Sequence, residues 1–204
     1  MQESYIAPMA SLIFLTHPEV VIDPDQPVPE WPLNATGRAR MERFAERLAG
    51  RDVSAVYAST ERKAMDGAAI VAERLGLSYD TDEDLGENDR SSTGFIAPPE
   101  FWDVVRAFFG NPHESIRGWE RAIDAQTRIV NAIGRILRED ETSGDIVVVS
   151  HGGVGCLLTA HLQRVEIGKE SRPSHPGGGC FIRIDRDSFA LTQDWRTIED
   201  GFAA

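Results

Sequence analysis

The segment 145–162, DIVVVSHGGVGCLLTAHL, leaves few choices of fold. Its unbroken β-branched run at 146–149 is typical of a strand buried on both faces, and the Ser-His-Gly-Gly sequence that follows ends the strand abruptly. Apolar residues then recur at helical spacing, so the segment predicts a strand, a tight turn and a helix. Ligands bind at the carboxyl edge of open α/β sheets, and a helix N-terminus attracts anions. His151 and Gly152 are therefore expected to face a phosphate or a carboxylate; the alternative is a histidine that only caps a turn.

A second histidine follows a second strand. Residues 11–15 form an apolar run that is closed by Thr16, His17 and a proline. A single histidine at the end of a strand is usually structural. Two histidines at the ends of two buried strands favour a shared site, which we place at the carboxyl edge of the sheet.

The remaining segments alternate between the two periodicities. Helices are predicted over 34–50, 59–75, 100–109 and 119–139, a further strand over 53–58, and a closing β-hairpin over 180–184 and 189–191. The acidic segment 80–89 is predicted to be a solvated loop. These elements predict a single α/β domain over residues 1–204, a three-layer α/β/α sandwich with a mostly parallel central sheet.

Composition excludes several classes of function. The 204-residue chain has a net charge of −12, which argues against a nucleic-acid surface and against binding to anionic membranes. The amino-terminal residues lack the pattern of a signal peptide, so a cytoplasmic protein is expected. The two cysteines are interpreted as reduced, and no spacing suggests a metal site. An anionic substrate would therefore need a local basic pocket in an acidic protein.

Arg62 is the first candidate for that local charge. It falls in the first turn of the predicted helix 59–75, where a cation is unfavourable beside the positive end of the helix dipole. A bound anion would compensate this cost. The alternative is an ordinary solvated arginine.

Six motifs in the same order resemble the histidine phosphatase superfamily, also called the phosphoglycerate mutase-like family. They are LIFLTHPE (12–19), LNATGRAR (33–40), VYASTERKAMDGA (56–68), LGE (85–87), the helix at 120–128 and VSHGG (149–153). The resemblance covers nearly the whole chain. It implies the phosphoglycerate mutase-like fold. Residues 90–118, in which serines, glycines and prolines surround one amphipathic segment, are expected to form a lid-like insertion over the sheet edge.

The resemblance also implies a mechanism and its residues. His17 would attack a small phosphorylated substrate and form a phosphohistidine, which water then hydrolyses. Arg62 and His151 would hold the phosphate oxygens, together with Thr16 and Gly152. Glu87 would protonate the leaving oxygen, with Glu120 as a second, lower-ranked acid. No metal and no cofactor would be needed.

One departure from the family pattern matters most: Thr16 stands where the family has an arginine before the nucleophilic histidine. A threonine supplies one neutral hydrogen bond and no charge, so phosphate binding and catalysis should weaken unless Arg40 or Arg90 fills the gap. The main hypothesis is a metal-independent phosphomonoesterase. The alternative is a weakened phosphate-binding or anion-binding protein, and phosphoglycerate mutase activity is less favoured.

Overall fold

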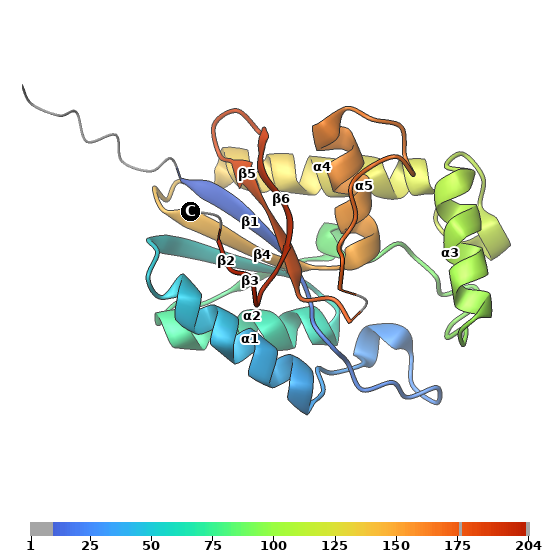
Figure 1. The fold of residues 1–204 in the computed structure, drawn as a ribbon, viewed down its shortest axis with the longest axis horizontal. Coiled ribbons are helices and arrows are strands. Elements are labelled where there is room, and N and C mark those ends of the chain that lie inside the picture. Colours follow the sequence, from blue (N-terminus) through green and yellow to red (C-terminus); the bar gives the residue numbers. More distant parts are fainter. Residues whose placement is uncertain (1–9, 176, 203–204) are drawn as a thin grey trace, which may run out of the picture.

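A computed structural model describes residues 10–175 and 177–202 of the chain. In that part, six strands form one sheet in the order β3-β2-β4-β1-β5-β6 (Figure 1). Strands β3, β2, β4 and β1 are parallel to one another, and β5 runs antiparallel to β1 and β6. The strands are β1 (Ser11–Thr16), β2 (Val53–Ser59), β3 (Asp80–Asp82), β4 (Asp145–Ser150), β5 (Cys180–Asp185) and β6 (Leu191–Thr197).

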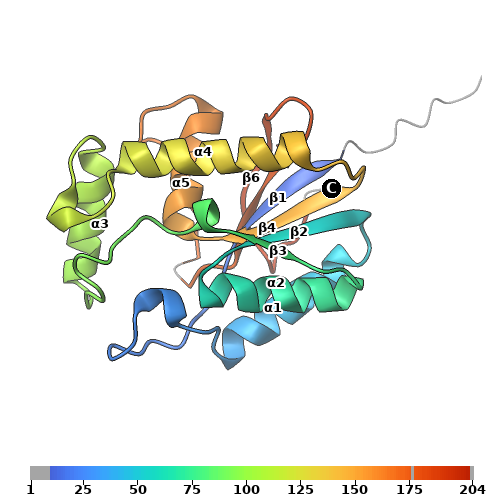
Figure 2. The same cartoon turned by 180° about the vertical axis from the view of Figure 1, so that it is seen from behind.

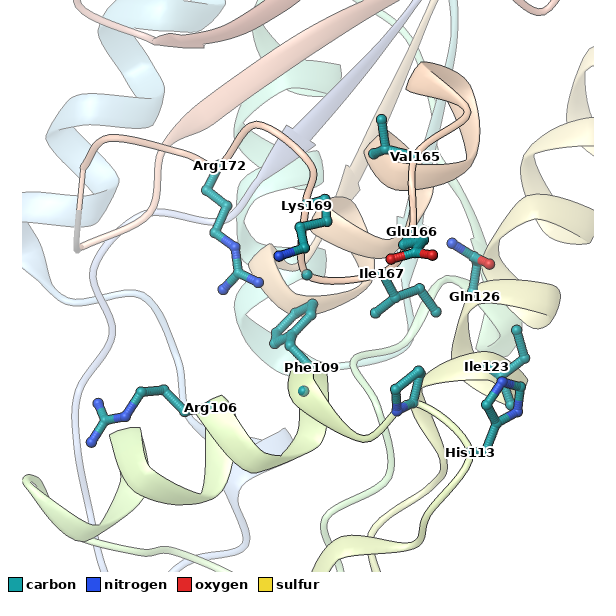
Figure 3. A pocket seen from close by; sticks show the side chains of 13 residues that line it. Arg106, Phe109, His113, Ile123, Gln126, Val165, Glu166, Ile167, Lys169 and Arg172 are labelled. Atoms are coloured by element: carbon teal, nitrogen blue, oxygen red, sulfur yellow. The ribbon is translucent and has the colours of Figure 1, made fainter.

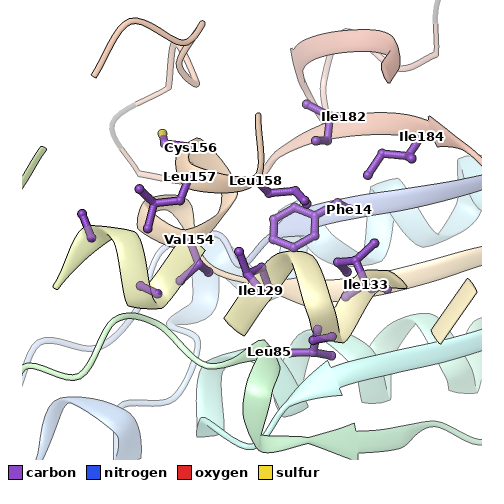
Figure 4. Close-up of a cluster of buried hydrophobic side chains, with 14 of the residues drawn as sticks. Phe14, Leu85, Ile129, Ile133, Val154, Cys156, Leu157, Leu158, Ile182 and Ile184 are labelled. Carbon is purple, nitrogen blue, oxygen red and sulfur yellow. The ribbon is translucent and has the colours of Figure 1, made fainter. Parts of the chain in front are cut away.

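Helices cover both faces of the sheet (Figures 1 and 2). One face packs against α1 (Ala35–Leu48) and α2 (Arg62–Leu75), and the other against α4 (Ala122–Glu139) and α5 (Gly152–Gln163). The residues of β1 alternate between the two cores. Phe14 packs with α4 and α5 (Figure 4). Ile13 and Leu15 pack with α1 and α2. Every residue of β1 and β4 is buried, as expected for central strands covered on both faces.

The predicted three-layer fold with a mostly parallel sheet is confirmed, but two edge strands differ from expectation. β3 lies in the acidic segment that was predicted to be a loop, and β6 begins at Leu191, where the predicted strand ends. Both are edge strands whose residues are mostly exposed or half-buried, so they need few apolar side chains and carry a weak signal in the sequence. Leu85, just after β3, is fully buried.

Residues 90–118 contain α3 (Glu100–Gly110) and the short helix Ile116–Gly118. Figures 1 and 2 show α3 apart from the other helices, beyond one end of the sheet. Its apolar face, which includes Val104 and Phe108, joins the core formed by α4 and α5. No helix in residues 10–175 and 177–202 is long and apolar enough to cross a membrane.

Candidate active site

The two histidines lie side by side at the carboxyl ends of the central strands. β1 and β4 are parallel neighbours in which Thr16 pairs with Ser150, so His17 and His151 are the next residues on each strand. The His17 backbone N–H donates to the Ser150 carbonyl at 3.0 Å. The ring centroids are 5.2 Å apart and the rings meet edge to face. Strand register alone therefore brings together two residues that are far apart in the sequence.

The environment of His17 fixes its tautomer and its charge. Its Nδ1 lies 2.8 Å from the Pro18 carbonyl oxygen, which can only accept a hydrogen bond, so Nδ1 carries the proton. The lone pair is then on Nε2. Burial, followed by the positive influence of His151 and Lys63, lowers the pKa of His17 to about 3. A neutral imidazole with a free Nε2 is a competent nucleophile.

His151 is fully buried at the start of α5. Its Nε2 lies 2.8 Å from Ser59 Oγ and 3.4 Å from Glu61 Oε1. Burial lowers the pKa of His151, although the charges of Glu61 and Glu87 oppose this effect. Within residues 10–175 and 177–202 its Nδ1 has no hydrogen-bond partner. A buried polar atom without a partner is unfavourable, so a ligand oxygen or a water molecule at this atom would be stabilising.

Glu87 is held at the N-terminus of α5. Its two carboxylate oxygens accept the backbone N–H groups of Gly153 and Val154, each at 3.0 Å. Burial would raise the pKa of Glu87, but nearby Arg90 and His151 and the Gly153 N–H together lower it. Glu87 is therefore ionised at neutral pH in the free protein, and it must take up a proton before it can act as an acid.

The structure does not bring Arg62 to this cluster. The Arg62 side chain is half exposed, and its Nε donates to Asp66 Oδ1 at 2.9 Å. The next residue, Lys63, is instead buried at 3% exposure and is close enough to lower the pKa of both His17 and His151. Sequence reasoning missed Lys63. The helical period of α2 carried the signal, because Lys63 lies on the same buried face as Gly67 and Val71.

Glu61 is a second residue that sequence reasoning missed. It forms an ion pair with Lys63, and its Oε1 accepts the Glu87 backbone N–H at 2.9 Å. Burial would raise the pKa of Glu61, but the charges of His151 and Lys63 and these hydrogen bonds lower it to about 2. Lys63 Nζ also donates to the Val28 carbonyl at 2.9 Å. The buried cation is thus already balanced by a carboxylate.

Thr16 and Gly152, the other two predicted phosphate ligands, both line the cavity that contains His17. Thr16 Oγ1 accepts the Cys180 backbone N–H at 3.0 Å and so ties β1 to the start of β5. Its hydroxyl proton remains able to donate to a ligand. Gly152 is the first residue of α5, where backbone N–H groups are not used within the helix.

The structure separates the two candidates for the missing arginine. Arg40 is buried, and it donates to both oxygens of Glu199 and to Glu19 and the Gly178 carbonyl. Arg40 is therefore occupied by structural contacts. Arg90 lines the cavity instead, with Nη2 4.0 Å from Glu87 Oε2.

Glu120, the lower-ranked acid, has a structural partner. Its carboxylate accepts from Arg128 at 2.8 and 3.1 Å. Arg128 also donates to the carbonyl oxygens of Asp84, Gly86 and Glu87. This ion pair holds the segment that carries Glu87, which supports ranking Glu87 ahead of Glu120 as the acid.

The site opens into a cavity of about 630 Å³ between the sheet edge and α3. Its lining includes His17, Glu87 and Arg90 together with aromatic side chains of α3. A second cavity of about 680 Å³ adjoins it and shares Phe109 and Arg172 as lining residues (Figure 3). In residues 10–175 and 177–202 no group of three or more His, Cys, Asp or Glu side chains is arranged to hold a metal ion.

The fold and the paired histidines define a class of protein, and the comparison with known families agrees with it. Residues 13–193 match the model of the histidine phosphatase superfamily, branch 1. The chain therefore belongs to the histidine phosphatase superfamily. It is 32% identical over 127 residues to the uncharacterised protein Rv0525 of Mycobacterium tuberculosis, and the match covers 61% of this chain and 62% of that relative. The chain thus spans about three fifths of the length of this relative.

Solved structures share the fold over almost the whole chain. Bacillus stearothermophilus YhfR is similar with a TM-score of 0.77 and 23% identity, over 90% of this chain and 95% of that one. A mycobacterial glucosyl-3-phosphoglycerate phosphatase, Rv2419c, solved with inorganic phosphate, has a TM-score of 0.73 and 21% identity over 91% and 95% of the two chains. Phosphoglycerate mutase from Bacillus anthracis has a TM-score of 0.72 and 16% identity over 94% and 95%. At these identities the likeness concerns the fold.

Proposed function

We propose that the protein is a metal-independent phosphomonoesterase that acts on a small phosphorylated metabolite in the cytoplasm through a phosphohistidine on His17. The observation that carries this proposal is the state of His17. Its Nδ1 proton is engaged by the Pro18 carbonyl, its pKa is about 3, and it lines the cavity. Nε2 is therefore the unprotonated nitrogen that an in-line attack on phosphorus requires.

In the first step, His17 Nε2 forms a bond to phosphorus as the bond from phosphorus to the alcohol oxygen breaks. Protonated Glu87 gives its proton to the departing oxygen. In the second step, Glu87 takes a proton from water, the water oxygen attacks phosphorus, and the phosphorus–nitrogen bond breaks to release phosphate and neutral His17. Lys63, Arg90 and the N-terminus of α5 are the groups that would stabilise the phosphoryl oxygens.

Trapping the intermediate tests this proposal. The protein is treated with EDTA, incubated with a phosphate monoester labelled on phosphorus, and quenched in alkali. We expect acid-labile label on a peptide that contains His17, undiminished by EDTA, and no label in His17→Gln. A broad panel of esters that gives neither label nor free phosphate would refute the proposal, and turnover abolished by EDTA would refute metal independence.

A second candidate function is anion binding without turnover. Thr16 in the arginine position favours it, as does the pairing of Lys63 with Glu61, because both reduce the positive charge available to a phosphate. Calorimetric titration with vanadate separates the two functions. Vanadate binding without hydrolysis of any ester supports the second candidate.

A further inference from the structure

The cations of this site are already compensated by carboxylates. Lys63 is paired with Glu61, and Arg90 faces Glu87 at 4.0 Å. Arg172, the other arginine that lines the cavity, lies 2.9 Å from Glu170. A bound phosphate must compete with these carboxylates for the same positive charges. The phosphoryl group therefore contributes less to affinity here than in a site with unpaired arginines.

Part of the wall of the cavity is apolar and largely aromatic. It is formed by one face of α3 and by the residue that precedes Glu120. The guanidinium of Arg90 lies 5.5 Å from the ring centres of two of these residues, Phe101 and Trp119, so its charge is spread over an aromatic surface. The wall consists of Phe101, Trp102, Val105, Phe108, Phe109 and Trp119.

Two side chains at the rim of the cavity are unusually exposed. Among the described residues, Ile22 at 62% and Trp102 at 48% are the most exposed large hydrophobic side chains, and both line this cavity. Ile22 comes from the loop before α1 and Trp102 from α3. Apolar side chains that are exposed together at a cavity mark a binding surface. A ligand that covers them removes apolar area from water, which lowers the free energy of the complex.

We infer that the substrate is a phosphate monoester whose leaving alcohol carries a flat, apolar ring system, held against Trp102 and Ile22. This inference rests on the proposed function and specifies its substrate class. Aromatic rings in contact prefer offset or edge-to-face packing, which the wall of α3 offers to a planar group. Contacts of the leaving group with this wall then supply binding affinity that the phosphoryl group cannot obtain from cations already paired with carboxylates.

Two esters with leaving groups of similar basicity test the inference. Ethyl phosphate and 2-naphthylmethyl phosphate both release a primary alcohol, so a difference in kcat/KM reports contacts made by the ring system. We expect kcat/KM to be at least about 100-fold higher for the naphthylmethyl ester, in line with the discrimination that apolar pockets achieve. A ratio below about threefold would overturn the inference.

Three variants connect the preference to the rim. Trp102→Ala should lower the ratio of the two kcat/KM values about tenfold, and Ile22→Ala should lower it by a smaller factor. Val21→Ala is the matched control, because Val21 is 44% exposed beside Ile22 but is not part of the cavity lining. It should leave the ratio unchanged. A ratio that is the same in wild type and Trp102→Ala contradicts the inference.

Failure of the inference is distinguishable from failure of the proposed function. Equal hydrolysis of both esters leaves the phosphatase proposal intact and removes the inference. If no ester is hydrolysed, binding of 2-naphthylmethyl phosphonate is measured by calorimetry in wild type and Trp102→Ala. Binding that depends on Trp102 supports the apolar ligand while the phosphatase proposal fails, and an absence of binding removes both.

Discussion

Each of two neighbouring cations, Lys63 and Arg62, is paired with a carboxylate. Glu61 balances Lys63 beside the two histidines, and Asp66 balances Arg62 on the outer face of α2. These neighbouring cations differ in burial, since Lys63 is 3% exposed and the Arg62 side chain is 54% exposed. The buried one, Lys63, lowers the pKa of His17.

This difference predicts a large effect on kcat/KM for one of two neighbouring substitutions and almost none for the other. If the proposed function holds, Lys63→Gln should lower kcat/KM at least about 100-fold, because a preorganised charge proposed to stabilise the transferring phosphoryl group is lost. Arg62→Gln should change kcat/KM by less than about twofold, because an exposed ion pair contributes little. Steady-state kinetics on one ester measures both. The reverse ranking would show that Arg62 holds the phosphate.

Loss of Lys63 also leaves Glu61 buried without its partner, so stability needs a separate control. Thermal unfolding of Lys63→Gln should show a lower Tm. The double variant Glu61→Gln, Lys63→Gln restores the charge balance, and it should recover Tm without recovering activity. Recovery of activity in the double variant would mean that Lys63 acts only through folding.

The lowered pKa of Glu87, the proposed acid, leads to a prediction for the pH dependence of kcat/KM. This pKa lies below the ordinary range, so the protonated form becomes scarce as the pH rises. The kcat/KM should therefore fall about tenfold per pH unit above that pKa, whereas neutral His17, with a pKa of about 3, imposes a limit only in strong acid. Glu87→Gln should have a kcat/KM at least about 100-fold lower. In this variant kcat/KM should fall with rising pH only as far as the ionisation of the substrate phosphate requires. Identical pH profiles would rule out Glu87 as the acid.

At the scale of elements, the start of α5 is built around the Glu87 carboxylate. A Cβ atom on Gly153 would lie 2.5 Å from Glu87 Oε1, whereas a Cβ on Gly152 would have nothing within 4 Å. A side chain at position 153 would therefore displace the Glu87 carboxylate, and glycine allows the carboxylate to approach the backbone. A similar constraint holds at Gly178, which has a φ of +75° and lies against the His17 carbonyl.

Alanine substitutions at the two adjacent glycines of α5 should change the free energy of unfolding differently. Gly153→Ala should lower the free energy of unfolding by about 1–3 kcal/mol, because the new methyl group displaces a buried carboxylate from its hydrogen bonds. Gly152→Ala should leave it unchanged or raise it by up to about 1 kcal/mol, because alanine favours the helix. Urea denaturation measures both values. Equal losses would contradict the structural explanation.

At the scale of the whole molecule, the net charge of −12 opposes the approach of an anionic substrate. Added salt screens this long-range repulsion, while the partly buried contacts of the site are screened less. Raising the ionic strength from about 0.01 M to about 0.15 M should therefore increase kcat/KM by about two- to threefold. A sucrose control of equal osmolality should have no such effect. A decrease with salt would indicate that local cations dominate the encounter.

Several features of the fold and of the site could be predicted from the sequence. The apolar runs of β1 and β4 identify central strands, and parallel neighbours necessarily place the residues after them, His17 and His151, at one edge. The edge strands β3 and β6 were missed or displaced because most of their residues are exposed or half-buried and form no continuous apolar pattern. Helical periodicity identified α1, α2, α4 and α5 because their apolar faces are continuous.

The sequence by itself determined the layers of the domain, the family pattern and the meeting of the two histidines, because these follow from local periodicity and strand register. Tertiary structure alone decided the charge of the site. Ion pairs such as Arg40 with Glu199 and Lys63 with Glu61 depend on distances of a few ångströms between side chains of different segments or neighbouring turns. Neither spacing in the sequence nor residue type fixes such distances, since they are set by how separate elements pack.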